Sequence, residues 1–178
     1  MFRSPSLFRL VAAALTVTTL ALVLSASAAS AGSSRSGLAF TAEDISGAPA
    51  GSVNLSGAGS FDSTGTFAEV GGAFLCTDSV GQGPLAGCQT GDGVRWHTDT
   101  PLSSTPFRCA TDAVKTGTPG PDTAVFRAEF FRAGARNLPS FVANVIVSAH
   151  DIAPDLPGLQ TVWIQGVGCA DASLHQIG

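Results

Sequence analysis

Two histidine–aspartate pairs are the residues in this chain whose spacing could support catalysis. His97 and Asp99 are two positions apart, so on a β-strand they would share a face and the carboxylate could orient the imidazole. His150 and Asp151 are adjacent, where a strand gives way to a loop. Neither pair has a nucleophile nearby, and the G-x-S-x-G turn of hydrolases is absent from the sequence. The sequence therefore predicts no catalytic residue and leaves these four, with Trp96, as candidates for a site.

Metal and cofactor sites are not indicated either. Asp151 and Asp155 could offer oxygens to Ca²⁺, but the D-x-[DN]-x-[DN]-G loop is missing and turn capping explains both acids. A site made of His97, His150 and His175 would need a ligand from the chain's last few residues. Neither glycine-rich phosphate-binding motif occurs. We predict no metal and no cofactor.

The two tryptophans have two interpretations. Exposed in a groove, Trp96 and Trp163 could stack on a sugar or another planar ligand. Buried, they would pack in the core. Eleven phenylalanines and no tyrosine favour packing, because binding surfaces are usually rich in tyrosine.

Four cysteines, Cys76, Cys88, Cys109 and Cys169, predict two disulfides. Zinc sites favour C-x2-4-C pairs, whereas these cysteines are 12, 21 and 60 positions apart. Of the three connectivities, we prefer Cys76–Cys88 with Cys109–Cys169. The Gly- and Pro-containing stretch 77–87 can fold back on itself, and the second bridge would tie the last strand to the middle of the sheet.

Short apolar segments separated by Gly, Pro, Asp, Ser and Thr predict an all-β fold. The expected strands are 38–42, 52–61, 66–76, 94–98, 106–110, 123–132, 141–150 and 161–168. Segment 141–149 fits both a strand and a helix, and its β-branched residues favour the strand. In segment 123–132, the apolar residues Ala124, Phe126, Ala128 and Phe130 occupy every second position, which predicts a strand with one buried face. We expect seven or eight short antiparallel strands in a small closed barrel or a sandwich.

The N-terminus predicts export. Arg3 and Arg9 precede an uncharged apolar run over 10–24, and the small residues that follow allow cleavage after Ala28 or Ala31. The run is shorter than the roughly 20 residues that cross a bilayer, so no stable membrane anchor is expected after cleavage. The expected order is a signal peptide at 1–31, a flexible lead-in at 32–37, one β domain at 38–170 and a C-terminal tail at 171–178.

The overall composition agrees with a secreted bacterial domain. One lysine against eight arginines, with abundant Ala and Gly, is typical of a GC-rich bacterial genome. The net charge is −4 and no basic run occurs, which excludes nucleic acid as an expected partner.

The segments FLCTDSVGQGPLAGCQTGDGVRW, PFRC and DIAPDLPGLQTVWIQGVGC, within 50–169, resemble a family of small exported bacterial proteins with no known activity. The resemblance implies a compact β-rich secreted domain and no site residues.

The function expected from these features is an exported, non-catalytic β domain that binds a small molecule or an envelope component. The alternative is a small secreted hydrolase or isomerase that uses His97 with Asp99, or His150 with Asp151, in a barrel mouth. Convergence of either pair with a second polar cluster in a pocket would favour the enzyme. A filled interior would favour the binding domain.

Overall fold

The computed structural model describes residues 34–47, 51–135 and 137–177, and the predicted signal peptide at 1–31 lies outside these residues. Eleven strands and no helix occur in the described part of the chain, so it contains no helix that could span a membrane. The strands are β1 (Arg35–Gly47), β2 (Ser52–Asp62), β3 (Ala68–Asp78), β4 (Arg95–Pro101), β5 (Thr105–Phe107), β6 (Lys115–Gly117), β7 (Thr123–Phe131), β8 (Phe141–Ser148), β9 (Val162–Ile164), β10 (Gly168–Ala170) and β11 (Ala172–Ile177).

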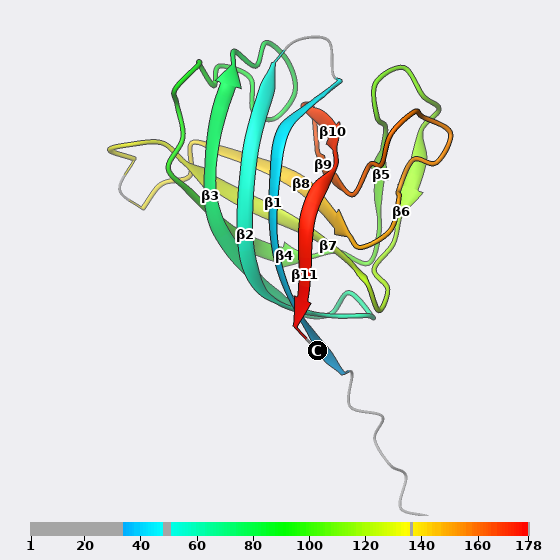
Figure 1. Ribbon diagram of the computed structural model, residues 1–178. Helices are drawn as coiled ribbons and strands as arrows, with labels where there is room; N and C mark the ends of the chain where they lie inside the picture. Colours follow the sequence, from blue (N-terminus) through cyan, green and yellow to red (C-terminus); the bar gives the residue numbers. More distant parts are fainter. Residues whose placement is uncertain (1–33, 48–50, 136, 178) are drawn as a thin grey trace, which may run out of the picture. The chain divides into compact units, whose positions relative to one another are not determined.

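Eight of these strands form a closed antiparallel ring, which confirms the predicted all-β class. Around the ring the order is β1, β2, β3, β4, β7, β8, β9 and β10, and β10 pairs back with the end of β1 at Ser46 and Gly47. In Figure 1 the long strands β1, β2 and β3 curve side by side along one side of the ring. The ambiguous segment 141–149 is a strand, β8, between β7 and β9.

The interior of the ring is filled by aromatic side chains around Trp96. This residue is 1% exposed. Its ring lies parallel to that of Phe126, with the two ring centroids 5.6 Å apart. The ring centroids of Phe40 and Phe130 lie 6.1 and 6.2 Å from that of Trp96. The indole Nε1 donates a hydrogen bond of 2.9 Å to the carbonyl of Ser56. Because a buried N–H needs an acceptor, this bond allows the largest side chain of the core to sit there.

Two paired glycines lie in the strands next to the indole, and each allows a close approach that a side chain would block. Trp96 on β4 is in register with Gly72 on β3, which is in register with Gly57 on β2. A Cβ added to Gly57 would lie 2.5 Å from Trp96 Cζ2, and one added to Gly72 would lie 2.0 Å from the carbonyl oxygen of Ser56. Gly72 therefore marks a close approach of the β2 backbone, and Gly57 marks a close approach of the Trp96 ring.

Gly72→Ala is expected to lower the free energy of unfolding by about 1–3 kcal/mol, because the new methyl group overlaps backbone that cannot move independently. Gly120→Ala is the matched control, since nothing lies within 4 Å of its added Cβ, and its effect should stay within about 0.5 kcal/mol. Urea unfolding of both variants measures the difference. Equal stabilities for the two variants would contradict the close approach.

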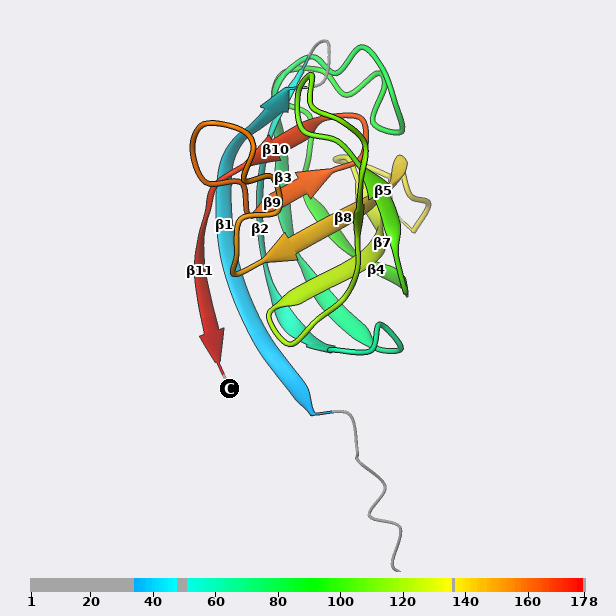
Figure 2. The same cartoon turned by 90° about the vertical axis from the view of Figure 1, so that its right-hand side faces the viewer.

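A second layer covers one outer face of the ring. The β5–β6 hairpin and the 149–160 loop pack over β7, β8 and β9, and Figures 1 and 2 show the hairpin on the outside of the ring. Val125, Ile146 and Trp163 point outward from the ring yet are at most 4% exposed, because they form a second core with Phe107 and Ala153. The expectation that 123–132 buries only one face is therefore wrong at Val125, and also at Phe131, which is 3% exposed.

Several element boundaries differ from those expected. Residues 172–177, assigned to a tail, form β11, because β10 covers only the end of β1 and leaves residues 37–42 of β1 free to pair. Residues 35–37, assigned to the lead-in, belong to β1. Segment 161–168 was expected to be a single strand. It contains β9, then a turn in which Gly166 has φ 79°, and then the first residue of β10.

Candidate functional site

The His97–Asp99 pair does not form. His97 lies on the outer surface, where its Nε2 is 3.3 Å from a carboxylate oxygen of Glu129 and its ring stacks on Phe131. The register of β4 against β7 shifts between Thr98 and Thr100, so a bulge at Asp99 interrupts the alternation of side chains. His97 and Asp99 each pair with a charged residue of β7, Glu129 and Arg127 respectively, so the Asp99 carboxylate does not orient the His97 imidazole.

Asp99 is instead held by an arginine. Arg127 Nε donates a hydrogen bond of 2.6 Å to the Asp99 carboxylate, and the Thr100 hydroxyl donates a second of 3.1 Å. The bond from Arg127 is the main reason that the pKa of Asp99 is lowered, with a smaller contribution from Thr100. A carboxylate kept ionised by a neighbouring guanidinium is a poor general base.

His150 and Asp151 also have separate partners. His150 Nε2 lies 3.1 Å from Asp122, and its side chain is 74% exposed. The Asp151 carboxylate accepts backbone N–H bonds from Ala153 at 2.9 Å and from Gln160 at 3.3 Å, so it closes the loop at 151–160. Neither His150 nor His97 has an imidazole hydrogen bond to a hydroxyl or thiol of a described residue.

The remaining candidates are also distributed over the molecule. Trp96 is inside the ring and cannot touch a ligand. His175 is exposed on β11, and Asp155 forms an ion pair of 2.7 Å with Lys115. No group of three or more His, Cys, Asp and Glu side chains suited to a metal ion occurs among the described residues.

One buried acid has a structural explanation. Asp62 is 1% exposed, and its carboxylate accepts hydrogen bonds from the hydroxyl and N–H groups of Thr64 and Thr66 in the β2–β3 turn. These bonds, that from the Thr66 hydroxyl first, hold the pKa of Asp62 far below its usual range. Since its described polar contacts all lie within its own hairpin, Asp62 caps the turn.

Both disulfides predicted from the sequence are present, with the preferred pairing. Cys76–Cys88 joins residues 12 apart, and Cys109–Cys169 joins residues 60 apart with Cα atoms separated by 5.3 Å. The first closes the loop after β3, and the second ties the segment after β5 to β10. Two disulfides within one chain are typical of extracellular proteins.

A cleft of about 850 Å³ lies between the segments that these disulfides hold. Gln82 and Gly83 of the loop between Cys76 and Cys88 form one wall, and Gly166 and Gly168 lie beside the β9–β10 turn. The remaining lining residues are Gly47 at the end of β1, Trp163 on β9, and Pro106, Phe107, Arg108, Ala110, Thr111 and Val114 from the β5–β6 hairpin. The cleft is the candidate functional site.

The floor of the cleft is aromatic. Phe107 and Trp163 meet edge to face with ring centroids 5.9 Å apart, and the indole Nε1 of Trp163 donates a hydrogen bond of 3.1 Å to the carbonyl of Arg108. The sequence offers Trp163 as a residue that could stack on a ligand, but no sequence motif indicates the other lining residues. The available signal was the Cys109–Cys169 pairing, which places the PFRC segment beside the last strands.

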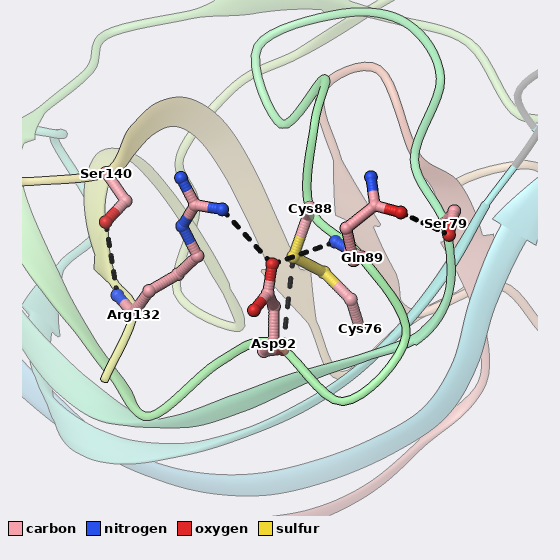
Figure 3. A network of polar contacts seen from close by, with 7 residues as sticks. All are labelled: Cys76, Ser79, Cys88, Gln89, Asp92, Arg132 and Ser140. Atoms are coloured by element: carbon pink, nitrogen blue, oxygen red, sulfur yellow. Dashed lines mark hydrogen bonds and ion pairs between the residues drawn. A yellow bond between two sulfur atoms is a disulfide. The ribbon is translucent and has the colours of Figure 1, made fainter. Parts of the chain in front are cut away.

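The loop between Cys76 and Cys88 is a firm wall. Val80 and Leu85 are at most 1% exposed and belong to the main core, so the loop also covers one end of the ring interior. Figure 3 shows the polar contacts beside the disulfide: Asp92 accepts bonds from the Gln89 N–H at 3.0 Å and from Arg132 at 3.2 Å. The Gln89 N–H and then Arg132 lower the pKa of the Asp92 carboxyl.

Asp92→Asn is expected to reduce the melting temperature by a few degrees at neutral pH. A lowered pKa in the folded state means that ionised Asp92 stabilises the fold above the ordinary value of 3.8, and that this stability is lost as pH falls through the folded value. The difference from wild type should therefore shrink in acid. Thermal unfolding from neutral pH to acid tests this, with Glu43→Gln, an exposed change of the same charge, as control. A difference independent of pH would contradict the ionic role.

Searches of family models, curated proteins and solved structures find no match to this chain. Its function therefore has to be inferred from the geometry of the site.

Proposed function

We propose that this chain is an exported, non-catalytic domain that binds a small molecule in the cleft between the Cys76–Cys88 loop, the β5–β6 hairpin and the β9–β10 turn. The observation that carries the proposal is the construction of the cleft. Two disulfides hold its walls and a pair of packed aromatic rings forms its floor. A preformed concave surface with an apolar floor and few polar groups is the usual form of a ligand site.

The filled ring interior supports a surface site of this kind. Trp96 and its aromatic neighbours occupy the space that a ligand would take in a hollow barrel, and Val80 and Leu85 cover one end. The enzyme alternative gains no support from the same geometry. His97 and His150 do not line the cleft, and each faces a carboxylate other than its predicted partner.

Export is the second part of the proposal. It rests on the predicted signal peptide and on the two disulfides, which persist in oxidising compartments. Secreted material should begin at Ala29 or Gly32, and N-terminal sequencing tests this. A mature chain that begins at Met1 would overturn export.

Binding in the cleft is tested with N-phenylnaphthylamine, an uncharged apolar dye whose fluorescence rises on binding. Val114 lines the cleft and is 67% exposed, so Val114→Glu should weaken dye binding severalfold without affecting the core. Leu138→Glu is the matched control, since Leu138 is 78% exposed and is not a lining residue. Equal loss or no loss in the two variants would overturn the proposal.

A further inference from the structure

Arg108 differs from the other described cations because its side chain has no partner among the described residues. Its guanidinium makes no ion pair, hydrogen bond or ring contact with a described residue, and the residue is exposed. The other described cations contact carboxylates or aromatic rings: Arg35, Arg95, Lys115, Arg127 and Arg132. In an acidic chain with thirteen Asp and Glu residues against nine basic ones, an arginine free of acidic neighbours is unusual.

Among the described residues, Arg108 is also the one charged residue that lines the cleft. The lining includes no Asp or Glu, so nothing in the wall neutralises the guanidinium or repels an anion. The acid closest in sequence, Asp112, is already paired with Lys115 at 2.7 Å. Gln82 and Thr111 add uncharged polar groups to the same cleft.

The rest of the lining suits an apolar body. Phe107 and Trp163 are packed at the floor, and the Val114 side chain remains largely exposed at the cleft although it is aliphatic. Covering exposed apolar surface is favourable in proportion to the area removed from water. A guanidinium beside such a surface forms strong charge-assisted hydrogen bonds with carboxylate, sulfonate or phosphate oxygens.

We propose that the cleft binds an amphipathic organic anion, with the apolar body against Val114 and the Phe107–Trp163 floor and the acidic group paired with Arg108. This inference rests on the proposed function, because it names the class of ligand for the same cleft. The net negative charge of the chain disfavours general attraction of anions, so binding of this class should depend on Arg108 itself.

The test compares two dyes with nearly the same aromatic body. Anilinonaphthalene sulfonate carries one anionic group, and N-phenylnaphthylamine carries none. Arg108→Gln should weaken binding of the sulfonate about tenfold, the size expected for loss of one charge-assisted hydrogen bond, and leave the uncharged dye within about twofold. Arg108→Lys keeps the charge and should retain part of the preference. Near-ultraviolet circular dichroism, sensitive to Trp96 and Trp163, verifies that each variant is folded.

Arg127→Gln is the matched control, because it removes the same charge from an exposed arginine that does not line the cleft. It should leave both affinities unchanged. If both dyes respond to Val114→Glu but neither responds to Arg108→Gln, the anionic ligand class is wrong and the cleft remains a binding site. If neither dye responds to Val114→Glu, the dyes do not occupy the cleft and both proposals fail.

Discussion

Removal of the Cys109–Cys169 disulfide, by Cys109→Ala with Cys169→Ala, is expected to lower the free energy of unfolding by about 4 kcal/mol. The bridge closes a long loop, since its cysteines are 60 positions apart, and a cross-link over a long loop restricts the unfolded chain most. Both cysteines are also buried in the second core, at 2% and 7% exposure, so their loss disturbs packing between β10 and the β5–β6 hairpin.

The Cys76→Ala/Cys88→Ala variant is the comparison for this prediction. Its cysteines are 12 positions apart, and the chain-entropy estimate for a loop of that length is about 3 kcal/mol. Urea unfolding without reductant, with thiol titration to verify the remaining bridge, measures both. A larger loss from the short bridge than from the long one would contradict the argument from loop length.

The Cys109–Cys169 bridge should also matter for binding. Arg108 and Ala110 flank Cys109, and Gly168 precedes Cys169, so the bridge holds two walls of the cleft together. N-phenylnaphthylamine affinity should therefore fall when the bridge is removed, under conditions where the variant is still folded. Unchanged affinity in the folded variant would mean that the second core alone shapes the cleft.

Trp96→Ala is expected to cost about 3–5 kcal/mol, the range for truncating a large aromatic side chain in a packed core. The indole is 1% exposed and lies among Phe40, Phe126 and Phe130, and Gly57 beside it has no side chain that could move into the space it leaves. The cavity should therefore remain largely open. The lost bond from Nε1 to the Ser56 carbonyl adds to the effect.

Val94→Ala is the control for Trp96→Ala. Val94 is two positions away but 47% exposed, so its truncation should change stability by no more than about 0.5 kcal/mol. Urea unfolding followed by far-ultraviolet circular dichroism measures both variants, because this signal does not depend on the tryptophan that is removed. A Trp96→Ala variant as stable as Val94→Ala would mean that the ring interior is not the main core.

Local pattern was enough to predict most strands. Apolar segments bounded by Gly, Pro, Asp and Ser correspond to β2, β3, β7 and β8, because strand formation depends on alternation and on β-branched content that neighbouring residues supply. The small strands β6, β10 and β11 were not predicted. Their pairing with β5, β9 and β1 depends on which edges remain free, which is a property of the assembled sheet.

The sequence by itself determined the all-β class and the two disulfides, because strand periodicity is local and the cysteine spacings favour one pairing. Only the tertiary structure decided which side chains meet. His97 pairs with Glu129 and Asp99 with Arg127 rather than with each other, and the cleft joins residues 82–83, 106–114 and 163–168, which are remote in sequence. Such convergence depends on strand register and ring closure, and these are set by pairing between distant segments rather than by any local pattern.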